Sequence, residues 1–279
     1  MSFFLSLDEQ SIQHSVDEIS HEFVKEKKLP LDKNYNLEIE TWTINDVYKH
    51  AKTEKGDFKS DLINFLVETV CEQFITHDYF EYRLNNIWSS RITNANPEYH
   101  ILFIVAKPNA NHIFNKNGNK NRTIFKRILG FIMFRFDTCW SRNFVSELSV
   151  FCKRKSKKQD YAYGAYLLAI FLHIVAQKKP WIQYVILEAL IGAKNLHRYY
   201  KRIGFVEIPK KRLKREFSCL PPSPRESGPV MILDLDNMTT QNILEYTLYK
   251  RTNKNSVSKE IRNLITTLRS KGEMYSSSS

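Results

Sequence analysis

The run FVSELSVF (residues 144–151) opens the stretch that decides the fold, which continues to Phe205. Its length and β-branched content are typical of a buried strand. A basic segment, KRKSKK (153–158), and the residues QDYAYG (159–164) come next. The apolar sequence AYLLAIFLHIV (165–175) then predicts a buried helix. The predicted order is therefore strand, basic turn with small residues, helix.

This order predicts a site for an anion. The first turn of a helix leaves backbone N–H groups unpaired and carries the positive end of the helix dipole. Small residues at Ala162, Gly164 and Ala165 would let a diphosphate approach the backbone, and Lys155, Lys157 and Lys158 could screen its charge. The turn has neither a Walker loop nor a dinucleotide fingerprint, which argues against the ligands of those motifs.

Two motifs in the stretch resemble those of the GNAT acyltransferase superfamily. Gln159-x-x-Ala162-x-Gly164 is similar to the Q/R-x-x-G-x-G/A signature, with alanine for its first glycine. NLHRYYKRIGF (195–205) resembles the second motif, a helix ending in Y-x-x-x-G-F, and the strand-like residues 181–190 lie between the two. The resemblance implies an α/β (α+β) GNAT fold, with a mixed, mostly antiparallel sheet flanked by helices on both faces. It also implies that acetyl-CoA is bound by Leu148, Val150, Gln159, Tyr161, Ala162, Tyr163, Gly164, Ala165 and Asn195.

The sequence around this stretch predicts one α/β domain with an appendage at each end. We expect an N-terminal appendage over residues 1–34, containing a short helix packed on the core. The acetyltransferase domain should cover residues 35–237, and a C-terminal helical extension with a disordered end residues 238–279. Further strands are predicted at 37–42, 99–105, 128–136, 206–208 and 230–235, and helices after Asn45-Asp46 and within 62–75, 79–88, 241–249 and 259–269. Three strands between residues 99 and 151 follow one another without a helix, which favours antiparallel pairing.

Composition limits the class of protein. With 279 residues and 42% apolar content, the chain can bury one full core. The net charge of +12 fits an acidic ligand, a nucleic-acid neighbour or simply a solvated basic surface, and these alternatives stay open. Residues 1–9 lack a signal-peptide pattern, and the apolar helix over 165–176 is shorter than the ~20 residues that a membrane span needs.

The cysteines suggest a reducing compartment. Cys71, Cys139, Cys152 and Cys219 are far apart and form no C-x-x-C pair. We therefore expect reduced thiols and a protein of the nucleus and cytoplasm. We also expect a monomer with no metal site.

Acetyl transfer to an amine needs a base for the amine and an acid for the departing thiolate. Glu147 is the candidate base, because a carboxylate inside an apolar strand is costly unless it is used or paired. Tyr200 is the candidate acid, since it matches the tyrosine of the family's second motif, and Tyr199 is its competitor. Structural roles for both residues stay open: an ion pair or solvent-facing position for Glu147, and a core position for Tyr200.

A narrower resemblance concerns the substrate. FRFD (134–137) followed by SELSV (146–150) is similar to the paired strands of NatD-type enzymes, which acetylate histone amino termini. It implies that Asp137 and Trp88 bind the substrate, with Asp137 receiving a cationic group. Cys139 and Ser146 depart from that pattern, as does the turn at 161–164. A GNAT enzyme for lysine side chains, other amino termini or a small amine remains an alternative, as do a non-catalytic CoA-binding module and a nucleic-acid binder.

Overall fold

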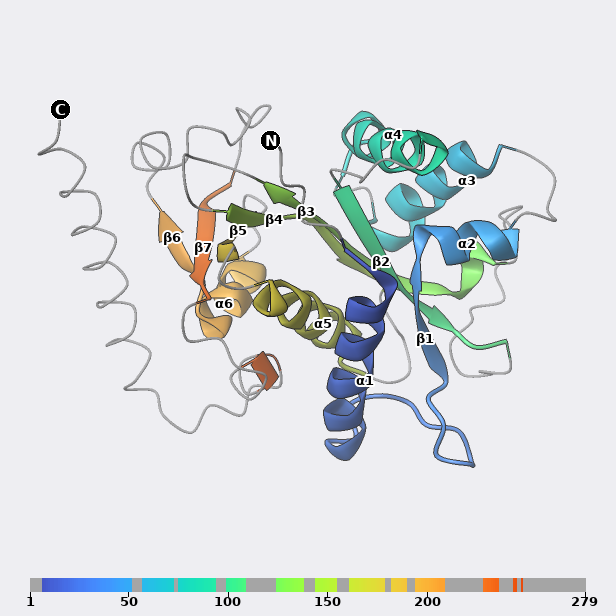
Figure 1. Cartoon of the computed structure of the whole chain (residues 1–279), viewed down its shortest axis with the longest axis horizontal. Coiled ribbons are helices and arrows are strands. Elements are labelled where there is room, and N and C mark those ends of the chain that lie inside the picture. The colour runs from blue at the N-terminus through green and yellow to red at the C-terminus, as the bar shows by residue number, and fades with distance from the viewer. Residues whose placement is uncertain are drawn as a thin grey trace, which may run out of the picture. The chain divides into compact units, whose positions relative to one another are not determined.

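The structure is a computed structural model that describes twelve parts of the chain: residues 7–51, 57–72, 75–93, 99–108, 124–137, 144–154, 161–178, 182–189, 194–208, 228–235, 243–244 and 247. Its strands follow the order β1-β2-β3-β4-β5-β7-β6 (Figure 1). The chain divides into two compact units. The first unit comprises Met1–Arg135 and Ser149–Ile174, and the second Phe136–Leu148 and Val175–Ser279.

In the first unit, both strand pairs whose register is described are antiparallel. β1 (Ile39–Thr43) pairs with β2 (Tyr99–Ala106), and β2 pairs with β3 (Ile128–Asp137), both antiparallel. β4 (Phe144–Lys153) is next in the strand order. Every residue of β2 is buried, so this strand is covered on both faces. The antiparallel pairing predicted for residues 99–105 and 128–136 is confirmed.

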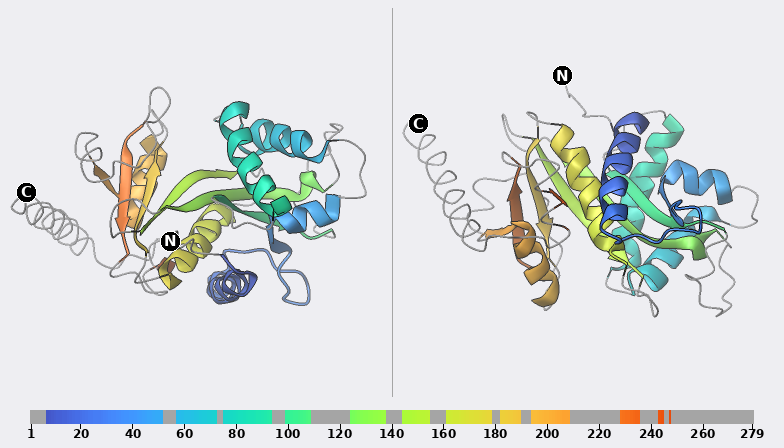
Figure 2. Two further views of the ribbon diagram at one scale, coloured as in Figure 1. Left: turned by 45° about the horizontal axis from the view of Figure 1, so that its top comes forward. Right: turned by 90° about the horizontal axis from the view of Figure 1, so that it is seen from below.

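Helices cover both faces of this part of the sheet (Figure 2). One face carries α2 (Ile44–Ala51), α3 (Phe58–Phe65), the π-helical η1 (Leu66–Val70) and α4 (His77–Thr93). A short 3₁₀ turn, η2 (Phe125–Arg127), precedes β3. The other face carries α5 (Tyr163–Gln177), whose Phe171 ring lies 4.9 Å from that of Phe134 on β3, centroid to centroid.

The N-terminal helix α1 (Glu9–Lys25) packs on α5. Ser20 Oγ and the Tyr166 hydroxyl form a buried hydrogen bond of 2.6 Å. His173 on α5 contacts α1 through both ring nitrogens: Nδ1 lies 3.0 Å from Ser15 Oγ and Nε2 lies 3.0 Å from Glu18 Oε2. Because these polar groups satisfy one another, they can be buried between the two helices.

The start of α2 differs from the prediction. Asn45 and Asp46 were expected to cap this helix, but the helix begins at Ile44. The Thr43 N–H donates to Asp46 Oδ2 at 2.8 Å, and the Asp46 N–H donates to Thr43 Oγ1 at 3.4 Å. This reciprocal arrangement is a capping box in which Thr43 is the cap and Asp46 is the third helical residue, so Asn45 is already inside the helix.

The second unit contains a parallel pair and a hairpin. Residues 144–148 of β4 pair in parallel with residues 182–187 of β5 (Ile182–Glu188), as expected for strands joined through a crossover helix. β7 (Val230–Asp234) pairs antiparallel with both β5 and β6 (Val206–Ile208), which confirms the hairpin predicted for 206–208 and 230–235. α6 (Lys194–Ile203) lies between β5 and β6 in sequence.

The predicted α/β class with a mixed, mostly antiparallel sheet is therefore confirmed. The helices predicted at 241–249 and 259–269 lie outside the described residues, apart from Ile243, Leu244 and Thr247. Among the helices that the structure describes, none has both the length and the apolar character of a membrane span.

Candidate functional site

The turn before α5 presents a cluster of backbone donors. Ala162 caps the helix, since its carbonyl oxygen accepts the Tyr166 N–H at 2.8 Å. The N–H groups of Tyr163, Gly164 and Ala165 form the first helical turn and have no backbone acceptor in the described part of the chain. Three donors at the positive end of a helix dipole can bind a phosphate group. The helix predicted over residues 165–175 thus begins at Tyr163, and the binding of an anion at its first turn stays a prediction.

Gly164 lets this turn approach β4 closely. A Cβ atom at Gly164 would lie 3.3 Å from Phe151 Cζ and 3.5 Å from Lys153 Cδ. The Phe151 ring and the aliphatic part of the Lys153 side chain thus pack against the turn. Lys153 is exposed. Its ammonium group is a cation that can reach an anion at the turn. The sequence predicted a small residue here for the ligand, and the structure adds a packing reason for it.

The segment after α1 also contacts the turn. The Ala162 N–H donates to the carbonyl oxygen of Lys28 at 3.1 Å, and the Lys28 N–H donates to the carbonyl oxygen of Phe23 at 2.9 Å. The Ala162 donor is therefore taken, which leaves the three N–H groups of the first helical turn for a ligand. Sequence reasoning missed this contact because no local pattern links residues so far apart in the chain.

Two tyrosines flank the turn, at the positions predicted to bind the coenzyme. The rings of Tyr161 and Tyr163 lie 5.7 Å apart, and Tyr163 is only 6% exposed. Burial raises the pKa of Tyr163, and the neighbouring Tyr161 and Glu38 raise it further. Its hydroxyl is protonated at neutral pH and has no hydrogen-bond partner among the described residues. Gln159 and Lys155, Lys157 and Lys158, also assigned to this site, lie outside the described residues.

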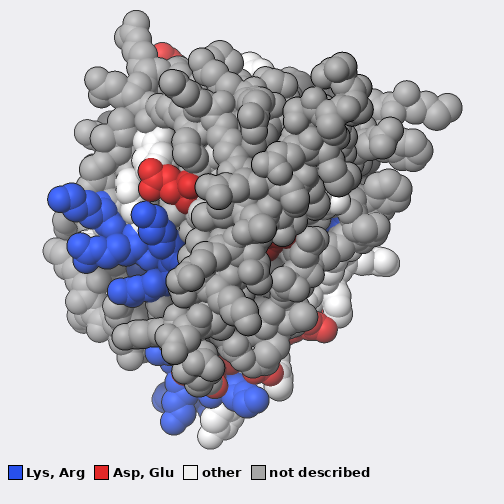
Figure 3. Space-filling view, turned by 90° about the vertical axis from the view of Figure 1, so that its left-hand side faces the viewer, with Lys and Arg blue, Asp and Glu red and all other residues white. Residues whose placement is uncertain are grey.

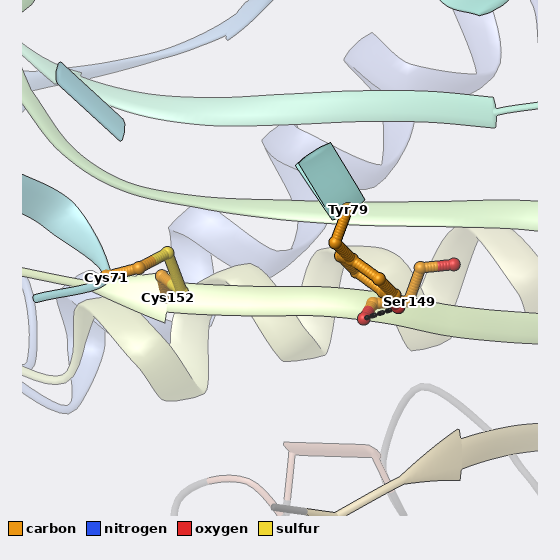
Figure 4. Close-up of a disulfide and its surroundings, with 4 residues drawn as sticks. All are labelled: Cys71, Tyr79, Ser149 and Cys152. Atoms are coloured by element: carbon orange, nitrogen blue, oxygen red, sulfur yellow. Dashed lines mark hydrogen bonds between the residues drawn. A yellow bond between two sulfur atoms is a disulfide. The ribbon is translucent and has the colours of Figure 1, made fainter. Parts of the chain in front are cut away.

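A disulfide fixes the end of β4 that supports the turn (Figure 4). Cys71, the residue after η1, is bonded to Cys152 of β4, with a Cα–Cα distance of 5.2 Å. In the same region the Tyr79 hydroxyl of α4 donates to the Ser149 carbonyl oxygen at 3.5 Å. The expectation of reduced cysteines is therefore wrong for this pair. The chain folds so that two cysteines 81 residues apart become neighbours, which their spacing in sequence could not reveal.

The predicted base, Glu147, lies on β4 in the second unit. It is opposite Ile186 in the parallel β4–β5 pair and is half-buried, with buried neighbours on both sides, Ser146 and Leu148. The pairing ends at Leu148 and Leu187, although β4 itself continues to Lys153. Val150, in the first unit, is buried, and its predicted coenzyme contact stays a prediction.

The predicted acid, Tyr200, lies on α6 in the same unit as Glu147. It is 4% exposed, and its ring lies 5.6 Å from that of Phe205 and 5.7 Å from that of Tyr199. Burial raises the pKa of Tyr200, so its phenol stays protonated at neutral pH. A protonated phenol is suited to donate to a departing thiolate. Asn195 is exposed in the first turn of α6.

The predicted substrate residues are described to different extents. Trp88 on α4 is half-buried in an aromatic cluster, 5.1 Å from the Tyr48 ring and 5.4 Å from the Phe58 ring. Asp137 is the last residue of β3, and its side chain lies outside the described part of the structure. Substrate contact by these two residues stays a prediction.

The chain is similar to solved structures of acetyltransferases. A GNAT-family acetyltransferase from Staphylococcus aureus Mu50 is 17% identical, with 71% of this chain and 99% of that chain covered and a TM-score of 0.44. Tetrahymena Gcn5 is 17% identical over 73% of this chain and 99% of its own, with a TM-score of 0.40. A chain of the NatC complex bound to Gag peptide and CoA is 13% identical over 71% of this chain and 99% of its own, with a TM-score of 0.41. No protein-family model and no curated protein sequence matches the chain.

Proposed function

We propose that the protein is an N-acetyltransferase that uses acetyl-CoA as co-substrate. The observation that carries this proposal is the first turn of α5, where three N–H groups have no backbone acceptor among the described residues. Gly164 keeps that turn against β4, and Lys153 adds a positive charge beside it. This combination suits the pyrophosphate of a coenzyme. Its place between a buried strand and a buried helix is that of the motif that resembles the GNAT signature.

The proposed reaction is direct transfer within a ternary complex. Acetyl-CoA supplies an activated thioester carbonyl, which the acceptor amine attacks to form a C–N bond while the C–S bond breaks. Glu147, directly or through a water molecule, accepts the proton that the amine loses. Tyr200 donates its phenolic proton to the departing sulfur.

We propose a protein amino terminus as the acceptor, with histone-type Ser-Gly-Arg-Gly-Lys termini favoured. The support is the sequence around FRFD (134–137), in which Asp137 would pair with a cationic group of the substrate. Trp88 would line the path of the peptide. Lysine side chains, other amino termini and small amines are the alternative acceptors that the experiments below distinguish.

A backbone substitution tests the coenzyme site. Proline is tolerated in the first turn of a helix but has no N–H, so Ala165→Pro removes one of the three donors. Losing one hydrogen bond to a charged group costs about 1.5–3 kcal/mol, which corresponds to a loss in CoA affinity of about tenfold or more. Ala165→Val adds similar bulk, keeps the N–H and is the control. The coenzyme site is misplaced if calorimetry shows equal CoA affinity for the two variants.

Peptide acetylation tests the chemistry and the substrate. Mass spectrometry should detect acetyl transfer to the α-amine of a Ser-Gly-Arg-Gly-Lys peptide and none to an internal lysine of the same peptide with a blocked amino terminus. Glu147→Gln and Tyr200→Phe should each lower turnover about 10²-fold or more while CoA binding persists. CoA binding with no transfer to any amine would instead identify a non-catalytic CoA-binding module.

A further inference from the structure

The last residues of β4 connect the disulfide with the first turn of α5. Successive side chains of a strand point to opposite faces, so Cys152 lies on one face while Phe151 and Lys153 lie on the other. Cys152 packs against the core cluster of α2, α3 and α4, and Figure 4 shows its bond to Cys71 at this end of the strand. Phe151 and Lys153 pack instead against Gly164. One short segment therefore carries the disulfide on one face and supports α5 with the other.

The same segment is in close backbone contact with β3. The Arg154 N–H donates to the Leu129 carbonyl oxygen at 2.8 Å, and a Cβ atom at Gly130 would lie 2.9 Å from the Cys152 carbonyl oxygen. These contacts lie in the plane of the sheet, whereas the disulfide ties the strand to the helices that cover one face. Because Phe151 and Cys152 are consecutive, a displacement of Cys152 on that face moves the ring that supports the α5 turn.

The two cysteines differ in how accessible they are. Cys71 is 3% exposed, whereas Cys152 is only partly buried. Exchange begins when a thiolate attacks one sulfur of a disulfide, and its rate depends on access to that sulfur. Arg154 reaches the same face as Cys152, since its guanidinium carbon lies 5.8 Å from the centre of the Phe65 ring on α3. A cation on this face favours thiolates, so Cys152 is the sulfur suited to attack.

We propose that Cys71 and Cys152 form a reversible redox switch that controls binding of the coenzyme at the first turn of α5. The disulfide holds the end of β4 so that Phe151 keeps the turn in its binding geometry, and the dithiol form binds the coenzyme more weakly. The inference rests on the proposed coenzyme site. It does not depend on Glu147 or Tyr200, the proposed catalytic residues.

The reductant in this switch is a dithiol. One of its thiolates attacks the Cys152 sulfur, a mixed disulfide forms, and Cys71 leaves as a thiolate that takes up a proton. The second thiol of the reductant then attacks its own sulfur in the mixed disulfide and displaces Cys152, which also takes up a proton. The reductant ends as an intramolecular disulfide, and the protein gains two electrons and two protons.

The test compares coenzyme affinity in the two redox states of the full chain by calorimetry. The probe is desulfo-CoA, which has no thiol and so cannot exchange with the cysteines. The chain has a net charge of +12, and Figure 3 shows Lys and Arg side chains gathered on one face of the molecule. An anionic reductant would be attracted to such charge and would compete with the coenzyme, so the reductant is neutral dithiothreitol. Work at about 15 °C keeps the reduced protein near its maximum stability.

Reduction should weaken desulfo-CoA binding at least about fivefold, within the usual range of coupling between two sites. By linkage, saturating desulfo-CoA should raise by the same factor the ratio of reduced to oxidised dithiothreitol at which half of the disulfide is reduced. Alkylation and peptide mass spectrometry measure that fraction.

Two double variants serve as controls. Cys71→Ala/Cys152→Ala should bind desulfo-CoA like the reduced wild type, with or without reductant, and Cys139→Ser/Cys219→Ser should respond to reduction like the wild type. Equal or tighter binding by the reduced wild type overturns the switch and leaves the coenzyme site in place. Binding in neither redox state refutes the coenzyme site and the switch together.

Two further observations decide whether the effect is local. Circular dichroism should be the same before and after reduction, and loss of the helical signal overturns the proposal, because weak binding would then reflect unfolding. Dithiothreitol should reduce the disulfide in the folded protein. A disulfide that is reduced only after urea is added is a permanent structural bond, which also overturns the proposal.

Discussion

Removing the Cys71–Cys152 disulfide should destabilise the first unit strongly. The bond closes a loop between residues 81 apart and so restricts the unfolded chain. The loop-entropy relation gives about 4–5 kcal/mol for a loop of this length. Cys71 is also only 3% exposed and belongs to the core cluster formed with α2, α3 and α4, so the side chains around it are closely packed.

The assay is urea unfolding followed by tryptophan fluorescence, to which Trp42 and Trp88 of the first unit contribute. With a slope of about 2–3 kcal/mol per molar urea, the double variant Cys71→Ala/Cys152→Ala should lower the midpoint by about 1.3–2.5 M. Reduction of the wild-type protein should lower it by a similar amount, and reduction of the double variant should not move it. Alanine is preferred to serine because a buried hydroxyl would need a partner.

Two results would refute this reasoning. The first is alkylation of both Cys71 and Cys152 in protein that was unfolded without reductant, as seen by peptide mass spectrometry. The second is an unchanged midpoint in both the reduced protein and the double variant. The variant Cys139→Ser/Cys219→Ser is the control, and it should keep the response to reductant.

Three further changes should each be measurable by thermal unfolding. Burial lowers the pKa of His173, so the folded protein favours the neutral imidazole. The stability that this shift contributes is fully present above the pKa of about 6.5 in the unfolded chain and is lost as pH falls through the lower folded pKa. His173→Gln should therefore make the melting temperature less dependent on pH in this range. Gly130→Ala should cost about 1–3 kcal/mol, because the new Cβ would lie 2.9 Å from the Cys152 carbonyl oxygen, a backbone atom that cannot move alone. Ser20→Ala should cost about 1–3 kcal/mol by removing a buried partner of Tyr166, and a Tyr166→Phe background should reduce that cost.

The elements of the fold could be predicted where the sequence carries a strong local pattern. The apolar runs at 99–105, 128–136 and 165–175 became β2, β3 and α5 within a few residues. The cap of α2 was missed because Thr43 also ends β1, and its strand pattern concealed its capping role.

The candidate site was predictable only in its backbone. The turn at 162–165 follows from small residues between a strand and a helix, and its donors are where the pattern placed them. The contacts that hold the turn were not predictable, because the Lys28 carbonyl oxygen and Cys71 come from distant parts of the sequence. Such pairs become neighbours only through packing of the whole unit.

The docking of α1 on α5 has a consequence for how the protein is made. Ser20 and Tyr166 are 146 residues apart, and Ser15 and His173 are 158 apart. A ribosome adding about 5–20 residues per second needs roughly 7 to 30 s to make the second partner after the first. Helices in proteins take most of their stability from tertiary packing, and α1 has no docking surface on α5 until residues 163–177 have been translated. During that interval the face of α1 that carries Ser15 and Ser20 is open to chaperones.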